Sequence, residues 1–523
     1  MIYKYMYENG DIYIEDKENK KNKDFENIST LKNKPINKEE YPTLLDQIIC
    51  QYGYGIELWK IIICIIFIYI ICGYSGTIYA TLITAYTKKF NLTDAEVSSI
   101  GMVYFVSKAL GALFSGYFSK LLNGRVVLVN FSIFLILLTN VQLSYIPTKE
   151  MLFTERILSG GFCGIIEPII NNLLCEYLPI KLRGFFLLSV WIGYNIGQLF
   201  PNLIMLGVMP HYEPSEISKL LLLSCPLIFL CWIFSFIYLK DSARNYILHN
   251  QTDKGMQVLE KITPENKLSE ENKHRILKEV KEGINKDISS SEPWDVFKKE
   301  YIFLTICISA ISFLSNFIYD GPVLIMNLTL SSFANDDKDE DNILSNAIFI
   351  IVCSIPSSLI GGISLEISFF GRKWTMFYAF LFLLISLILA MLNTNYIHIY
   401  LGIYQFFASY CSIMAGIYAS EVFPSKIRDF SVGLSTFFSY AASAISQYVF
   451  IALNKYNKLS PYYFSIVCCL IGCIICTVLT VDTFQRPLDK VDGIENDDGN
   501  EIGAKNITNL SCDDDRIMLL NKD

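Results

Sequence analysis

The feature that most constrains this chain is the length of its apolar runs. The sequence contains twelve stretches of roughly 20 mostly apolar residues. Such a run crosses the hydrocarbon core of a bilayer as a helix, because no water is present there to hydrogen-bond the backbone. The sequence therefore predicts an all-α membrane protein with twelve transmembrane helices, at 60–84, 97–118, 126–145, 151–175, 185–207, 218–239, 302–326, 344–366, 374–393, 397–420, 430–452 and 461–482.

The polar segments between these runs carry a motif that occurs twice. Residues 176–184 read EYLPIKLRG and residues 421–429 read EVFPSKIRD, so the pattern E-x-x-P-x-K-x-R returns after 245 residues. A Gly-Arg pair returns after 247 residues, as Gly124-Arg125 and Gly371-Arg372. Two landmarks with nearly the same offset indicate an internal duplication. We therefore predict two six-helix halves, at 56–240 and 301–483.

The remaining segments are polar. We expect an unstructured tail at 1–55, a linker with short helices at 241–300, including a helical-looking stretch at 269–285, and an acidic tail at 484–523. The first 40 residues lack the apolar core of a signal peptide. Lys and Arg are more frequent in the short loops on one side, so the positive-inside rule places both tails, the linker and both motif copies in the cytosol.

Several classes of function lack support in the sequence. The net charge of −8 arises mainly in loops and tails, so it gives no argument for nucleic acid. We find no metal-ligand spacing, no phosphate-binding loop and no pairing of a nucleophile with a base. We therefore expect no enzymatic activity, no cofactor and no metal.

Four ionisable side chains lie inside the predicted helices, where burying an unpaired charge costs several kcal/mol. They are Lys108, Arg156, Glu167 and Asp320. At about 1.5 Å per residue, Lys108 and Glu167 reach similar depths from the outer side, so their side chains should meet. Two interpretations stay open: the pair only neutralises two buried charges, or it serves a solute or a proton.

Polar and small residues also recur on single helix faces. In 97–118 and 151–175 the repeated residues include Gly101, Gly111, Gly160 and Gly164. Such stripes either pack helices closely or line a wet cavity. The further candidates for contact with a solute are Ser75, Trp191, Asn195, Gln198, Asn316, Tyr440 and Gln447.

Together these landmarks resemble the major facilitator superfamily, in the branch of sugar porters, organic-ion transporters and synaptic-vesicle-protein-like carriers. The resemblance rests on LFTERILSGGFCG at 152–164, both E-x-x-P-x-K-x-R copies, both Gly-Arg loops and DSAR at 241–244. It implies the major facilitator fold and transport of a small organic solute by alternating access, alone or with a proton. It also implies a cytosolic latch that joins the two halves, formed by Arg125, Glu176, Arg183, Arg372, Glu421 and Arg428.

The chain also departs from the pattern of the family. The loop before Gly124 lacks the usual Asp, and Asp429 replaces the Gly that usually follows Arg428, so the latch should be altered. Proton-coupled sugar porters carry Gly-Tyr-Asp in the first helix, but Ser75 stands here in place of the Asp, and Arg156 therefore lacks that partner. These departures disfavour a hexose, and the short outer loops fit the synaptic-vesicle-protein-like carriers best.

The buried charges indicate which chemical class of substrate the protein carries. Lys108 and Arg156 favour a small organic anion such as a carboxylate. Glu167 and Asp320 would instead receive an organic cation or a coupling proton, and a sugar is a further alternative. The altered latch favours a second class of function, a transporter-like sensor or trafficking receptor without net flux.

The tails suggest where the protein acts. Residues 40–45 and 515–520 match the acidic di-leucine pattern that clathrin adaptors bind. We expect a monomer embedded in the lipid bilayer, with several membrane passes, in the plasma membrane or in an endolysosomal or vesicle membrane.

Overall fold

The computed structural model describes thirteen segments of the chain. The di-leucine stretches and residues 269–285 lie outside them. The described residues are 4–8, 11–15, 56–121, 124–178, 183–208, 213–248, 252–262, 296–333, 340–365, 371–392, 397–423, 425–457 and 459–479.

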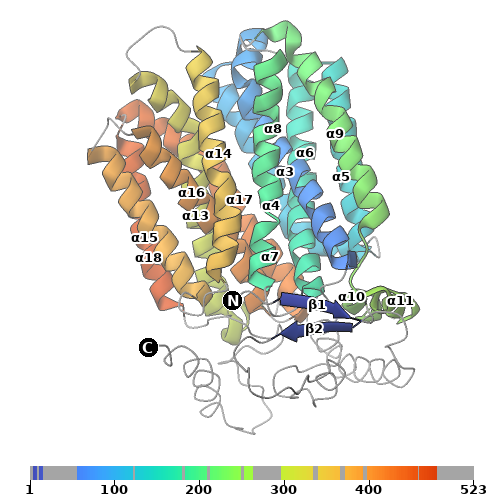
Figure 1. The fold of residues 1–523 in the computed structure, drawn as a ribbon. Coiled ribbons are helices and arrows are strands. Elements are labelled where there is room, and N and C mark those ends of the chain that lie inside the picture. Colours follow the sequence, from blue (N-terminus) through green and yellow to red (C-terminus); the bar gives the residue numbers. More distant parts are fainter. Residues whose placement is uncertain are drawn as a thin grey trace.

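The helices form one bundle made of two groups (Figure 1). The first group contains α3 (Ile56–Phe90), α4 (Asp94–Leu121), α5 (Arg125–Tyr145), α6 (Lys149–Tyr177), α7 (Arg183–Ser189), α8 (Ile192–Val208) and α9 (Ile217–Tyr238), with the short 3-10 helix η1 (Pro214–Glu216) before α9. The second group contains α13 (Lys299–Phe333), α14 (Glu340–Leu365), α15 (Gly371–Leu392), α16 (Ile397–Val422), α17 (Ser425–Tyr456) and α18 (Ser460–Val478).

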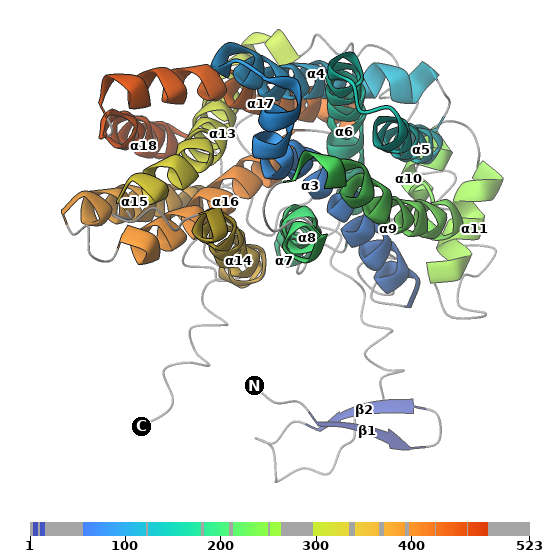
Figure 2. The ribbon, with the colours of Figure 1, turned by 90° about the horizontal axis from the view of Figure 1, so that it is seen from above.

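The two groups lie side by side and meet along a seam (Figure 2). At this seam α4 packs against α17, and α7 and α8 pack against α14. Within the described residues, ten helices are long and apolar enough to cross a membrane. The segments α7–α8 and α16 occupy the places of the two other predicted spans. The protein is therefore a multi-pass integral membrane protein.

The predicted span 185–207 is not one continuous helix. Between α7 and α8 the backbone tightens, because the N–H groups of Gly193 and Tyr194 donate to carbonyls only three residues back, those of Val190 and Trp191, at 3.1 and 3.0 Å. This tight turn holds Trp191 at the junction of the two pieces. The apolar run alone gave no sign of the break.

Among the described residues, two short helices and two strands lie outside the bundle helices. The linker contains α10 (Ala243–Leu248) and α11 (Thr252–Ile262) in its described part. Near the N-terminus, β1 (Lys4–Glu8) pairs antiparallel with β2 (Asp11–Glu15), whereas we expected no regular structure there. The reason lies in the sequence, since both strands are rich in tyrosine and isoleucine, which favour strands, and the dipeptide at 9–10 is Asn-Gly, which favours two-residue hairpin turns.

Candidate functional site

A polar cavity lies at the seam between the two halves. Its volume is about 50 Å³, several times the roughly 10–15 Å³ that a single water requires. The first half contributes α6 and the α7–α8 region, and the second half contributes α13, α16 and α17. The lining residues are Glu167, Asn171, Trp191, Tyr194, Asn195, Asn316, Tyr319, Asp320, Ser409, Ser412, Ile413, Gly416, Ser435, Thr436, Ser439 and Tyr440.

Lys108 and Glu167 meet, as their depths predicted. Nζ of Lys108 lies 2.7 Å from Oε1 of Glu167, and both side chains are almost completely buried. Glu167 lines the cavity, while Lys108 lies behind it, 4.1 Å from the ring centroid of Tyr440 and 5.4 Å from that of Tyr194. The ammonium group is thus held by one carboxylate and by aromatic faces, which attract a cation.

The sequence left open whether the glycine stripes pack helices closely or line a wet cavity. Gly111, Gly160 and Gly164 pack helices. A Cβ on Gly164 would collide with the carbonyl of Lys108, and one on Gly111 would collide with the carbonyl of Gly161. The backbones of α4 and α6 therefore touch. This contact fixes the Lys108–Glu167 pair on a rigid two-helix unit.

Asp320 and Asn316 present the polar face of α13 to the cavity. The hydroxyl of Ser443, on α17, donates to Asp320, and no basic side chain pairs with Asp320 among the described residues. Asn316 is satisfied within the second half, because it accepts from Ser412 at 2.9 Å and donates to the carbonyl of Ser312 at 3.1 Å.

Residues of α8 reach across the seam. Nδ2 of Asn195 donates to the carbonyl of Ser354 at 3.2 Å, and the Ser354 hydroxyl donates back to Oδ1 at 3.3 Å. Gln198 does not line the cavity; it accepts from the hydroxyl of Tyr319 at 3.3 Å. These bonds join the halves beside the cavity.

Trp191 lines the cavity and stacks on Tyr69, with ring centroids 4.6 Å apart. Its indole N–H is buried and has no hydrogen-bond acceptor among the described residues.

Arg156 has a carboxylate partner that the sequence did not reveal. Nε and Nη2 donate to the two oxygens of Glu155 at 2.6 and 2.9 Å, and Nη1 donates to the carbonyl of Ser75 at 2.9 Å. Glu155 thus provides the carboxylate that the first helix lacks, since Ser75 contributes only its backbone carbonyl. Adjacent residues on a helix normally point in different directions, so the spacing favoured no such pair. Both groups lie outside the cavity lining.

Gln447 also lies away from the cavity. Its Oε1 faces Gly101 of α4, on the helix half that precedes Lys108. Nearby, the hydroxyls of Ser99 and Tyr448 are 2.9 Å apart, so α4 and α17 are joined at this end of the seam.

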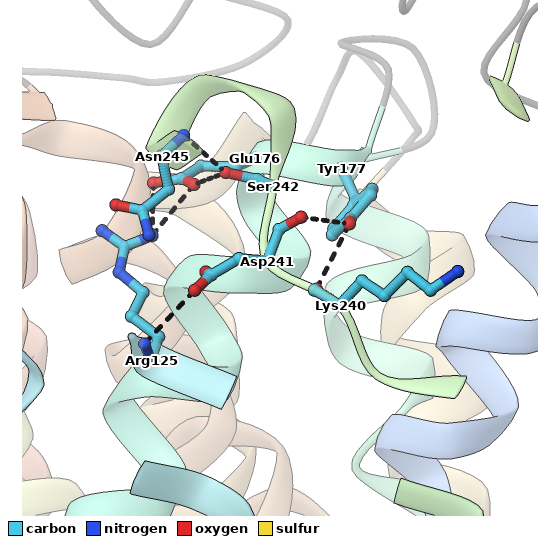
Figure 3. Close-up of polar contacts among 7 residues, drawn as sticks. All are labelled: Arg125, Glu176, Tyr177, Lys240, Asp241, Ser242 and Asn245. Carbon is cyan, nitrogen blue, oxygen red and sulfur yellow. Dashed lines mark hydrogen bonds and ion pairs between the residues drawn. The ribbon is translucent and has the colours of Figure 1, made fainter. Parts of the chain in front are cut away.

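Arg125 and Glu176 form a network at the end of the bundle where α5 begins and α6 ends, which we call the motif end (Figure 3). Nη1 of Arg125 lies 2.9 Å from both carboxylate oxygens of Glu176, and Ser242 also donates to Glu176. The backbone N–H of Arg125 donates to Asp241 at 3.2 Å. Burial raises the pKa of Asp241, although the Arg125 charge opposes this shift.

This network corrects the expected role of the Arg125–Glu176 pair. Arg125 and Glu176 belong to the first half and Asp241 begins the linker, so their contacts fasten the linker to α5 and α6. The hydroxyl of Tyr177 strengthens the same attachment by donating to the carbonyl of Asp241 at 2.7 Å.

The other motif residues lie closer to the seam. The helix α7, which begins at Arg183, contacts α16 of the second half, and α17, which contains Arg428, contacts α6 of the first half. Each of the two arginines also donates to a backbone carbonyl of its own half, Arg183 to Leu178 at 3.4 Å and Arg428 to Phe423 at 3.2 Å. The side chains of Arg372 and Asp429 lie outside the described part of the chain.

Six of the eleven predicted solute-contact residues line the cavity: Glu167, Trp191, Asn195, Asn316, Asp320 and Tyr440. The prediction missed the tyrosines Tyr194 and Tyr319, which belong to no polar stripe. It also missed the serines of α16, Ser409 and Ser412. Their spacing in 397–420 could have signalled a polar face, since they lie three residues apart.

Comparison with known proteins gives a family match and several relatives. The family profile described as sugar (and other) transporter matches residues 61–494. The 4-hydroxybenzoate transporter PcaK of Pseudomonas aeruginosa is 25% identical over 207 residues, which are 39% of this chain and 45% of that protein. This chain thus spans less than half the length of that relative. The synaptic vesicle 2-related protein of Rattus norvegicus is 24% identical over 427 residues, covering 77% of this chain and 74% of that protein.

The fold has a close counterpart among solved structures. The major facilitator superfamily proton:xylose symporter XylE, bound to 6-bromo-6-deoxy-D-glucose, superposes with a TM-score of 0.71 at 15% identity. The superposition covers 82% of this chain and 97% of XylE. At this identity the likeness concerns the fold, and it agrees with the two six-helix groups described above.

Proposed function

We propose that this chain, which belongs to the sugar and other transporter family of the major facilitator superfamily, carries a small organic anion together with a proton. The anion would pass through the cavity between the two halves. Members of this family are transporters and not enzymes. The observation that carries this proposal is the buried Lys108–Glu167 pair at the cavity wall. A buried ionisable group in a membrane protein marks a solute or proton pathway by default.

An anionic solute would take the place of Glu167 beside Lys108. Glu167 already faces the cavity, so a carboxylate entering there meets the ammonium once Glu167 turns away. Lys108 can keep its charge during the exchange, because the ring of Tyr440 lies 4.1 Å from Nζ. Tyr440 comes from the second half, so the exchange involves both halves.

Charge balance couples this exchange to a proton. The resting pair is neutral, with one ammonium and one carboxylate. When the solute carboxylate replaces Glu167, the site carries an excess negative charge unless Glu167 takes up a proton. Burying that excess charge away from water is costly, so each anion enters with one proton.

We propose that alternating access uses the contacts on both sides of the cavity. Toward one end of the seam, Ser99 contacts Tyr448, and toward the other, Gly433 of α17 approaches the carbonyl of Ala112 in α4. If the halves rock about the central site, one set of contacts opens while the other closes.

The relatives support the choice of an anion. PcaK carries 4-hydroxybenzoate, an aromatic carboxylate, and the cavity here has aromatic walls formed by Trp191, Tyr194, Tyr319 and Tyr440. We further propose that the motif end faces the cytosol, because its loops carry the excess of Lys and Arg.

A second candidate is transport of an organic cation. It is favoured by Asp320, which lines the cavity without a basic partner among the described residues. In this case the solute itself would neutralise the carboxylate.

Uptake into liposomes that contain the purified protein separates these candidates. We expect labelled benzoate and 4-hydroxybenzoate to enter faster than in protein-free liposomes, and labelled tetraethylammonium and glucose to show no difference. Uptake of tetraethylammonium alone would favour the cation candidate. Ligand-induced thermal stabilisation without uptake of any solute would favour a sensor or receptor.

A further inference from the structure

The hydrogen bonds of the lining residues show which groups are already satisfied. In the first half, Asn171 accepts from the hydroxyl of Tyr69 at 2.6 Å, and Asn195 is bonded to Ser354 across the seam. Trp191 differs from them, since its indole N–H is buried without an acceptor among the described residues. The first half therefore offers a free donor beside the Lys108–Glu167 pair.

The second half has the opposite character. Its cavity hydroxyls are largely satisfied within their own half: Ser412 donates to Asn316, Ser435 bonds to Ser312 at 2.7 Å and Thr436 donates to the carbonyl of Val432 at 2.7 Å. The ionisable group left facing the cavity there is Asp320, which receives one hydrogen bond, from Ser443. A carboxylate has room for several donors, so Asp320 offers a free acceptor.

The two ends are close enough for one small molecule. Glu167, Trp191 and Asp320 all line a single cavity, and Lys108 lies directly behind Glu167. A solute with only an acid group would satisfy the first half and leave the half-buried Asp320 without its second partner. Leaving a buried polar group unsatisfied costs free energy, so such a solute should bind less well.

We propose that the cargo is bipolar, with a carboxylate that binds Lys108 and Trp191 of the first half and a hydroxyl or amine that donates to Asp320 of the second half. This inference rests on the proposed anion transport and adds the requirement for a donor at the far end of the molecule. A bipolar solute joins the two halves through itself. The halves therefore close around the complete molecule more readily than around either of its ends.

Matched solutes test the requirement in proteoliposomes. We compare labelled 4-hydroxybenzoate with benzoate, which lacks the donor, and with 4-hydroxybenzyl alcohol, which lacks the acid. An aliphatic pair, 4-aminobutyrate and butyrate, repeats the comparison without a ring. We expect the bipolar member of at least one set to have a kcat/KM about tenfold or more above its one-ended analogues. The acid without a donor leaves Asp320 without a second partner, and the alcohol has no carboxylate to replace Glu167 beside Lys108.

Variants assign each end of the solute. Asp320→Asn should reduce the preference for 4-hydroxybenzoate over benzoate to about one, whereas Ser443→Ala removes the protein donor to Asp320 and should keep or increase that preference. Trp191→Phe should raise KM for both acids by about the same factor, roughly two- to tenfold. The control is Ser446→Ala, because Ser446 lies on the same helix, bonds only to the carbonyl of Ser443 and does not line the cavity. It should leave the preference unchanged.

The outcomes separate the two proposals. Equal transport of bipolar and one-ended acids by the wild type would overturn the bipolar cargo and leave anion transport standing. A preference that persists in Asp320→Asn would also overturn it. Uptake of none of the acids would remove anion transport, and the inference with it.

Discussion

Replacing either Lys108 or Glu167 alone should destabilise the protein far more than replacing both. Removing one partner of a buried ion pair costs about 3–5 kcal/mol, whereas replacing both with uncharged residues of similar volume is nearly neutral. The structure adds an asymmetry. In Lys108→Met, Glu167 loses its cation and has no hydrogen-bond donor among the described residues, so the full cost applies.

Glu167→Gln should be less damaging. Lys108 then retains the aromatic face of Tyr440 at 4.1 Å, and a desolvated cation–ring contact contributes about 2 kcal/mol. The expected costs are therefore about 3–5 kcal/mol for Lys108→Met, about 1–3 kcal/mol for Glu167→Gln and within about 1 kcal/mol of zero for the double variant.

This order of stabilities can be measured by heating the detergent-purified protein and using size-exclusion chromatography to record how much folded protein remains at each temperature. The wild type and the double variant should melt at similar temperatures, Glu167→Gln lower and Lys108→Met lowest. A double variant that melts as low as Lys108→Met would refute the reasoning, because it would show that the two charges do not serve each other. The same double variant should fold and yet fail to take up acids; retained uptake would assign the pair a structural role only.

Three further variants test other parts of the site. Glu155→Gln should lower expression and thermal stability by leaving its buried arginine without a carboxylate, while the exposed Glu150→Gln on the same helix should not; equal behaviour would contradict the bidentate pair. Gly164→Ala should disrupt folding because the new Cβ meets backbone, whereas Gly207→Ala enters open space and should be tolerated, as measured by the yield of monodisperse protein. Burial raises the pKa of Asp241, so the folded state holds this proton more tightly than the unfolded chain. The wild type should therefore lose stability relative to Asp241→Asn as pH rises from below 3.8 through the raised pKa. A difference in melting temperature between the two proteins that does not grow over this pH range would contradict the prediction.

The general architecture could be predicted from the sequence, because it depends on the simplest physical signal. Apolar runs of membrane length gave the helices, and the duplicated motif gave the two halves. The depth argument also brought Lys108 and Glu167 together, since helix rise is constant enough to compare positions on two neighbouring helices.

The local geometry could not be predicted in the same way. The Glu155–Arg156 pair joins sequence neighbours whose side chains turn toward each other only because of the surrounding packing. The break before α8 depends on tight backbone hydrogen bonds that hydropathy does not record. The resemblance to the family implied contacts between the halves at the motif copies and the Gly-Arg loops. Arg125 instead pairs with Glu176 of its own half, because α5 and α6 are neighbours.

The most direct test of the central claim is the number of protons that enter with each solute molecule. Proteoliposomes loaded with a pH-sensitive dye receive labelled 4-hydroxybenzoate, and solute entry and internal acidification are recorded together, with protein-free liposomes subtracted. The exchange at Lys108 and Glu167 predicts one proton for each anion, and neither flux in the Lys108→Met, Glu167→Gln double variant. Solute entry without protons, or stabilisation of the protein by the solute without entry, would contradict it.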